Sequence, residues 1–209
     1  MTILNRLAYL QTRRDRTPNL DLARDLVARK DEVGIREIAV NIWNENNNIH
    51  SDCLHVLYEI GIIDANLIEK YGEDFIKLLK SRDHNMVSGA MTALAEIAKV
   101  NSDFIFKYLD AIKKAKEIGK EITIDTSLSA LAHTAAANEK YNEAILPYLL
   151  QHLSTCRPKE VPQHAEIILP AVNESNKDRY IKTLKKRNDD LSGAAFTRLG
   201  RIIRLAEKL

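Results

Sequence analysis

The sequence repeats itself with a period of 37 residues. When residues 48–75 are laid over residues 85–112, eight of the 28 positions are identical. A repeat of this length is one supersecondary unit that cannot bury its apolar face alone, so successive copies must stack around a continuous core. The identical pairs are Asn48/Asn85, Ser51/Ser88, Leu57/Leu94, Glu59/Glu96, Ile60/Ile97, Ile68/Ile105, Lys70/Lys107 and Tyr71/Tyr108.

Each copy has the pattern of two helices. Leu67, Tyr71, Phe75 and Leu78 recur at steps of three and four, which is the spacing of one apolar helical face. A polar turn follows, and a second apolar stripe begins at Met91. Extended along the chain, the pattern predicts an all-α fold, an α-α superhelix of about six helix pairs in a single domain that spans residues 1–209. The expected pairs cover residues 2–29, 31–62, 66–99, 102–137, 140–170 and 176–209.

The composition favours helices over strands. The 209 residues include only seven Gly and five Pro, and aromatic residues make up 6%. Strand-rich proteins need turn residues and aromatic or β-branched runs. No stretch reaches the roughly 18 uncharged apolar residues of a membrane span, and two cysteines are too few for a secreted disulfide scaffold. We therefore expect a cytoplasmic protein with no membrane partner.

One segment of the repeat carries a family resemblance. Leu78-Leu-Lys-Ser-Arg-Asp83, followed by apolar positions at helical spacing, resembles a HEAT repeat, and Asp83 matches the turn aspartate of that pattern. Pro147 stands where the first HEAT helix commonly has a kinking proline. Ser88 stands where HEAT repeats usually have arginine, which indicates the armadillo-like end of the group. The resemblance implies an α-solenoid that serves as a scaffold for protein–protein interaction.

Motifs that carry catalysis do not occur in the sequence. With seven glycines there is no phosphate-binding loop, no dinucleotide-binding fingerprint and no G-x-S-x-G nucleophile elbow. Some HEAT-like proteins are metal-dependent hydroxylases that use His-Glu dipeptides, and this sequence has none. We therefore expect no catalytic residues and no cofactor.

Both cysteines have histidine neighbours in the sequence. Each group offers at most three ligands, and neither spacing fits a closed four-ligand zinc site. Cys53 also aligns with Ala90 in the repeat, which is typical of a small core residue. We therefore predict no metal site. The two groups are His50, Cys53 and His55, and His152, Cys156 and His164.

A polar stripe follows the second helices of the pairs, which typically line the concave side of a solenoid. Two interpretations are open: a hydrated, mildly acidic surface that binds an extended partner, or ordinary solvated helix faces. The stripe begins at Ser51, Ser88 and Asp125 in successive copies. Its candidate binding residues are His55, Glu59, Thr92, Glu96, Ser129, His133 and Glu166.

The net charge of +2 conceals an uneven distribution. Residues 21–75 have five Lys and Arg against twelve carboxylates, whereas residues 177–209 have ten Lys and Arg against four carboxylates. A terminal repeat must keep its outer face polar for solubility, but the same side chains suit the phosphates of a nucleic acid. The candidate basic patch on the last helix consists of Arg198, Arg201, Arg204 and Lys208.

Two functions remain open. The first is a non-catalytic HEAT-like scaffold for an unidentified protein or peptide. The alternative is a nucleic-acid-binding protein, or a diverged member of the HEAT-like alkylpurine DNA glycosylases, that uses the basic C-terminal repeat. Those glycosylases use aromatic residues and an acid in a basic groove. Trp43 is the only tryptophan here, and we expect it to pack at the edge of the apolar face rather than to stack on a ligand.

Overall fold

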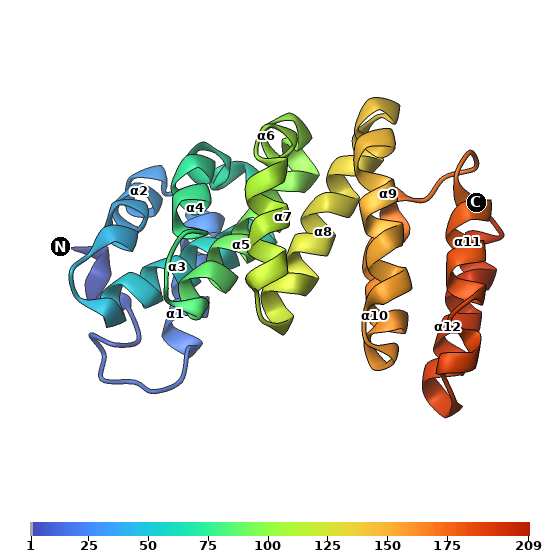
Figure 1. The fold of residues 1–209 in the computed structure, drawn as a ribbon. Coiled ribbons are helices and arrows are strands. Elements are labelled where there is room, and N and C mark those ends of the chain that lie inside the picture. The colour runs from blue at the N-terminus through green and yellow to red at the C-terminus, as the bar shows by residue number, and fades with distance from the viewer. Residues whose placement is uncertain (1) are drawn as a thin grey trace. The chain divides into compact units, whose positions relative to one another are not determined.

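The computed structural model describes residues 2–209 and is built from helices (Figure 1). Within these residues there are twelve α-helices, several short 3-10 helices and no β-strand. The prediction of an all-α fold made of about six helix pairs is therefore confirmed. The chain divides into two compact units, Met1–Ser127 (unit 1) and Leu128–Leu209 (unit 2). A single domain over residues 1–209 stays a prediction.

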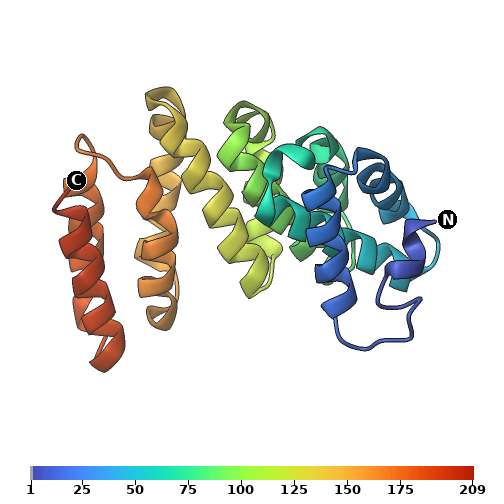
Figure 2. The ribbon, with the colours of Figure 1, turned by 180° about the vertical axis from the view of Figure 1, so that it is seen from behind.

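Within its described residues, unit 1 contains seven α-helices, the start of an eighth and four short 3-10 helices. Its second helices pack on one another, α3 against both α1 and α5, and Figure 2 shows the same helices from behind. The α-helices are α1 (Thr17–Arg29), α2 (Glu32–Val40), α3 (Asn47–Ile63), α4 (Gly72–Leu78), α5 (His84–Val100), α6 (Ser102–Lys107), α7 (Leu109–Ile118) and the start of α8 (Glu121–Ala137). The 3-10 helices are η1 (Ile3–Arg6), η2 (Asn41–Trp43), η3 (Ala65–Leu67) and η4 (Glu69–Tyr71).

The 37-residue repeat reappears as equivalent helix starts. Asn46 and Asp83 are the N-caps of α3 and α5, and the side chain of each accepts a hydrogen bond from the backbone N–H two residues later. Such caps satisfy N–H groups that have no partner inside the helix. Both helices are 17 residues long. Equivalent residues of the two copies therefore occupy equivalent places along α3 and α5.

The identical apolar positions of the repeat form the core of unit 1. Leu57 and Ile60 in α3 are fully buried, and so are their counterparts Leu94 and Ile97 in α5. Burial of each such side chain contributes about 1.5–3 kcal/mol. The packing of α3 on α5 thus explains why the same positions are apolar in both copies of the repeat.

A buried amide ties the N-terminal segment to unit 1. Asn19 in α1 has no exposed surface. Its side-chain oxygen accepts a hydrogen bond from the N–H of Ala8 at 2.9 Å, and its Nδ2 donates to Asp52 in α3 at 2.8 Å. The other oxygen of Asp52 accepts from the N–H of Tyr9 at 2.8 Å. These bonds connect the segment before α1 to both α1 and α3.

Unit 2 contains the end of α8 and two further helix pairs. The first helices α9 and α11 pack together, and so do the second helices α10 and α12. The helices are α9 (Glu139–Thr155), α10 (Val161–Ile168), α11 (Lys177–Lys185) and α12 (Gly193–Ala206), with η5 (Pro158–Glu160), η6 (Leu169–Ala171) and η7 (Asn188–Asp190) between them.

Two buried asparagines join the helix pairs of unit 2. Asn142 in α9 donates through Nδ2 to the carbonyl oxygen of Ala171 at 2.7 Å. Asn176, the N-cap of α11, donates through Nδ2 to the Asn142 side-chain oxygen at 3.0 Å and to the same carbonyl at 3.2 Å. Because buried polar groups are costly without partners, this network fixes where α11 begins relative to α9.

No helix in residues 2–209 combines the length and the apolar character needed to cross a lipid bilayer.

Candidate functional site

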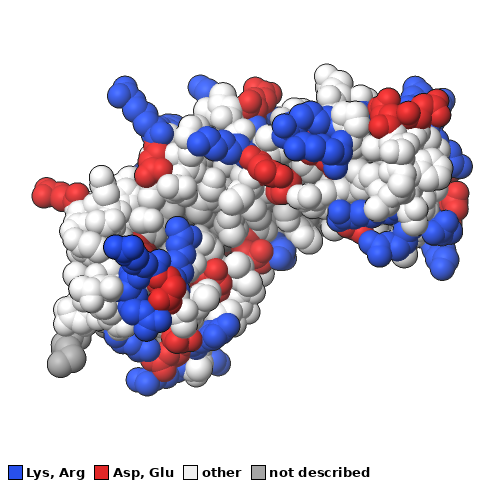
Figure 3. Space-filling model, turned by 90° about the horizontal axis from the view of Figure 1, so that it is seen from below, with Lys and Arg blue, Asp and Glu red and all other residues white. Residues whose placement is uncertain are grey.

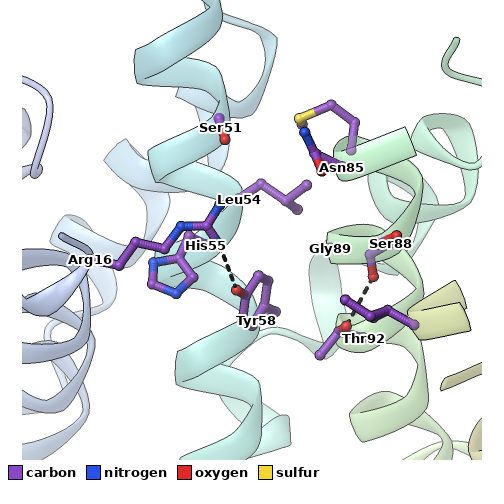
Figure 4. A pocket seen from close by; sticks show the side chains of 11 residues that line it. Arg16, Ser51, Leu54, His55, Tyr58, Asn85, Ser88, Gly89 and Thr92 are labelled. Carbon is purple, nitrogen blue, oxygen red and sulfur yellow. Dashed lines mark hydrogen bonds between the residues drawn. The ribbon is translucent and has the colours of Figure 1, made fainter. Parts of the chain in front are cut away.

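A hollow of about 160 Å³ lies between the second helices of unit 1 (Figure 4). Arg16, which precedes α1, and His55 and Tyr58 of α3 line one part of it, whereas Ser88 and Thr92 of α5 line another. Four positions of the polar stripe thus border one cavity, namely Ser51, His55, Ser88 and Thr92. Leu54, Asn85, Met86, Gly89 and Ile122 complete the lining.

His55 is the most buried polar side chain of the hollow, with 5% of its surface exposed. Its Nε2 lies 3.5 Å from a carboxylate oxygen of Glu59, and its ring meets that of Tyr58 edge-on at 4.9 Å. Burial, helped by the cation of Arg16, lowers the pKa of His55 to about 4, against a smaller opposing effect of Asp52. His55 is therefore a neutral imidazole at pH 7. Its buried Nδ1 has no hydrogen-bond partner among the described residues.

The opposite wall depends on a glycine in α5. A Cβ at Gly89 would come within 2.8 Å of the Leu54 side chain, so a glycine lets α5 approach α3 closely at this point. The neighbouring Ser88 hydroxyl is 2.9 Å from the hydroxyl of Thr123 in α8. Thr92 donates to the backbone carbonyl of Ser88 at 2.9 Å. These hydroxyls are held in place at the rim by bonds within unit 1.

Glu59 and Glu96 lie outside the lining of the hollow, and nearby cations offset both carboxylates. Burial raises the pKa of Glu59, while the positive charges of Arg24 and Arg16 act in the opposite direction. Glu96 forms an ion pair with Lys99 at 2.6 Å. Both of these carboxylates therefore have cations nearby, and the two interpretations of the stripe stay open.

The remaining candidate residues of the stripe belong to unit 2. Ser129 and His133 are half-buried on α8. Glu166 is half-buried on α10, where it accepts from Arg198 Nε at 3.0 Å and from Arg201 at 2.6 Å. Both arginines lie on α12, so one predicted stripe residue is the ion-pair partner of two residues of the predicted basic patch.

The basic patch on α12 is thereby partly neutralised. Arg198, Arg201 and Arg204 line a shallow hollow on α12, and Lys208 is exposed just beyond the helix. The ion pairs with Glu166 hold the pKa of that carboxyl below its usual range, chiefly through the hydrogen bond from Arg198. On the face shown in Figure 3, basic and acidic side chains are interspersed in small groups. This arrangement provides less free positive charge than the sequence count suggests.

The two Cys/His groups differ in the structure, because the ligand atoms of only one of them lie close together among the described residues. Cys53 has no exposed surface and lies in the core, as expected from its alignment with Ala90. The described residues contain one group of three whose ligand atoms lie close enough to hold a metal ion. That group is His152, Cys156 and His164.

Trp43 ends η2 and is 48% exposed. It lines a shallow hollow with Val40, Tyr71 and Asp74. About half of the Trp43 side chain is therefore covered by neighbouring residues, which agrees with a partly buried position beside the apolar face.

Seven of the eleven lining residues of the hollow are not in the predicted stripe, and two of these seven, Arg16 and Tyr58, lie close to each other. Arg16 lies in the irregular segment before α1, where the repeat gives no alignment. Its Nη1 is 3.4 Å from the hydroxyl of Tyr58. Tyr58 lies three residues after His55, on the same face of α3, and this helical spacing is a signal by which it was predictable.

Comparison with known proteins identifies the fold but no relative in sequence. No family model matches the chain. No curated protein matches it either. A designed armadillo repeat protein solved in complex with the peptide (KR)4 superposes with a TM-score of 0.68 and 14% identity, over 90% of this chain and 85% of that one. The fold is armadillo/HEAT-like.

Other solved structures have the same armadillo/HEAT-like architecture. An engineered protein superposes with a TM-score of 0.65 and 18% identity, over 100% of this chain and 98% of that one. Kap121p, in a structure bound to Pho4p, superposes with a TM-score of 0.59 and 16% identity, over 88% of this chain and 21% of Kap121p. At these identities the similarity describes the fold alone.

Proposed function

We propose that this chain is a non-catalytic armadillo/HEAT-like scaffold that binds a protein or peptide through the hollow of unit 1. The observation that carries the proposal is the polar lining of that hollow by two successive second helices, α3 and α5. A designed armadillo repeat protein of similar fold was solved with a bound peptide, and Kap121p with Pho4p. The fold is therefore compatible with a peptide partner.

The chemistry of the hollow suits an extended peptide segment. Arg16 donates hydrogen bonds at the rim, and the hydroxyls of Ser51 and Tyr58 both donate and accept. Leu54 and Met86 add apolar surface to the same cavity. A volume of about 160 Å³ matches a side chain rather than a cofactor. We infer that one partner side chain enters the hollow while its backbone bonds to the rim.

The polar groups of the hollow are arranged for binding rather than for acyl transfer. A nucleophilic serine needs a base within hydrogen-bond reach. The Ser88 hydroxyl instead pairs with the Thr123 hydroxyl. His55, the one imidazole that lines the hollow, is beside the Glu59 carboxylate and the Tyr58 ring. A binding role also fits the cytoplasmic location proposed from the low cysteine count.

A variant whose side chains block the hollow tests whether peptides bind there. Peptides selected from a random library on the purified protein would be measured by fluorescence anisotropy against wild type and Ser51→Arg/Thr92→Arg. The two long cations fill the hollow, so we expect affinity to fall at least about tenfold, or 1.4 kcal/mol. Ser154→Arg/Ser192→Arg is the matched control, because both serines are exposed and lie in unit 2.

Two results would contradict the proposal. The first is equal affinity of the selected peptides for wild type and Ser51→Arg/Thr92→Arg. The second is recovery of the same proteins, in the same amounts, from a cytoplasmic extract by both forms. Circular dichroism of each variant separates loss of binding from loss of fold.

A further inference from the structure

Two histidines and a cysteine lie close together between the end of α9 and α10 in unit 2. His152 lies in the last turn of α9, and Cys156 is the C-cap of that helix. His164 lies in α10 and is 2% exposed. One ligand atom from each residue lies within 4.8 Å of the others, and Nε2 of His152 is 2.9 Å from Nδ1 of His164. Cys156 and His152 are both half-buried, so the group is open to solvent on one side.

The chain around this group is held by bonds from the next helix pair. Arg187, which is 8% exposed, donates through Nη1 to the carbonyl of Leu153 at 2.5 Å and through Nη2 to the carbonyl of Cys156 at 2.9 Å. The hydroxyl of Tyr180 donates to the carbonyl of Ala165 at 2.7 Å. The backbone on both sides of the group is therefore fixed by residues of or just after α11, and the three side chains are pre-positioned.

We propose that His152, Cys156 and His164 bind a zinc ion, with a fourth position left to water or an exogenous ligand. Thiolate and imidazole are the ligands that zinc prefers. In a tetrahedral site with Zn–N of about 2.1 Å and Zn–S of about 2.3 Å, ligand atoms are about 3.3–3.6 Å apart. The three ligand atoms lie within 4.8 Å of one another, and the two imidazole nitrogens are 2.9 Å apart. To complete the geometry, these nitrogens must separate by about 0.5 Å and any wider gap must shorten by about 1 Å, which small side-chain movements allow.

Among the described residues, one buried cation lies beside the group, and no further carboxylate is free to act as a ligand. The guanidinium of Arg187 bonds to two carbonyls, to Asp190 and to the side chain of Cys156, so its charge lies next to the thiol. Glu160, between Cys156 and His164 in sequence, is engaged by Arg157. The site is therefore a three-ligand site of the type that keeps an open position, and it is separate from the hollow of unit 1.

Cobalt provides a direct test, because Co²⁺ takes the place of zinc and reports its ligands in the visible and near-ultraviolet spectrum. The full-length protein, freed of metal by a chelator and kept reduced, would be titrated with Co²⁺ and then with Zn²⁺. We expect one equivalent of Co²⁺ to give tetrahedral d–d bands and a thiolate-to-cobalt charge-transfer band. Zn²⁺ should then displace cobalt and abolish both.

The variants identify the ligands. Cys156→Ser should remove the charge-transfer band, and His152→Gln should weaken binding at least about tenfold, since even residues that only orient ligands change affinity by 10–100-fold. Cys53→Ala should leave the spectrum unchanged, because Cys53 is buried and stands where the repeat already has alanine. His84→Gln, at an exposed site, controls for the number of histidines.

Some outcomes would overturn the zinc proposal. These are the lack of a one-to-one complex with either metal, or a charge-transfer band that survives Cys156→Ser and disappears in Cys53→Ala. Equal Co²⁺ affinity of wild type and His152→Gln would show that the two histidines serve only as a hydrogen-bonded pair. Circular dichroism in the absence of metal verifies that each variant folds.

Discussion

The buried imidazole of His55 makes unit 1 sensitive to acid. The pKa of His55 is lowered from 6.5 to about 4 in the folded protein, mainly by burial. Between those two pH values the unfolded chain binds a proton that the folded chain does not, so stability falls as the pH falls. The window of loss begins near pH 6.5 and ends near pH 4, below which this group contributes no further change.

The magnitude follows from the size of the pKa shift. A shift from 6.5 to about 4 corresponds to about 3 kcal/mol once both pKa values are passed. Between pH 7 and pH 5 the expected loss is about 2 kcal/mol, because His55 is protonated in nearly all unfolded molecules and in few folded ones. The charged groups around it are Arg16, Asp52 and Glu59, and of these Arg16 strengthens the shift while Asp52 weakens it.

The assay is urea unfolding at pH 7 and pH 5, followed by the fluorescence of Trp43. The only tryptophan lies in unit 1, so its signal reports on that unit. We expect wild type to lose about 2 kcal/mol more between the two pH values than His55→Gln, which cannot take up the proton. His50, whose pKa is lowered by burial, adds a loss that is common to both proteins and cancels.

His84→Gln is the control for this experiment, because His84 is exposed at the start of α5 in the same unit. Its loss of stability between pH 7 and pH 5 should equal that of wild type. If wild type and His55→Gln lose the same free energy, His55 is not the group that couples protonation to unfolding, and the argument from its burial fails.

Three further changes test unit 2. Asn142→Ala should lower the free energy of unfolding by about 2 kcal/mol, because buried partners of its amide lose their bonds; a loss below about 0.5 kcal/mol in chemical denaturation contradicts this. Arg187→Met should cost about 3 kcal/mol by the same measurement, since two carbonyls lose a charged donor, and Arg187→Lys should not restore it. Glu166→Gln should change stability by less than about 1 kcal/mol, because its ion pairs are largely exposed. The same variant frees Arg198 and Arg201 and should elute from heparin at higher salt; unchanged elution would show that the patch is not accessible to polyanions.

The helix pairs and their core were predictable from the repeat. Apolar residues at helical spacing specify which face of each helix is buried, whatever the neighbour is. Leu57 and Leu94 illustrate this, since both were aligned by the 37-residue shift and both are fully buried. The polar stripe was predictable from the same helical spacing, and Ser51, His55, Ser88 and Thr92 do border one hollow.

Contacts between polar residues of different helix pairs were not predictable. Asn142 and Asn176 are 34 positions apart, and no periodicity indicates that their side chains meet. From the sequence, Glu166 was predicted to be an acidic residue of the stripe. In the structure, two arginines of α12 form ion pairs with it. Such contacts depend on how far each helix is shifted along its neighbour, and that shift is set by the packing of whole helices.

By itself, the sequence determined that this chain is helical and repetitive, and which residues of each repeat are buried, because these properties depend on spacing within one helix. Tertiary structure alone decided which polar side chains outside the repeat pattern complete each site. The hollow needs Arg16 to reach Tyr58 across 42 positions. The His152, Cys156 and His164 group needs α10 to fold back beside the end of α9. The spacing of residues within one helix indicates which face of that helix is buried. A site, in contrast, forms only where the faces of several helices meet.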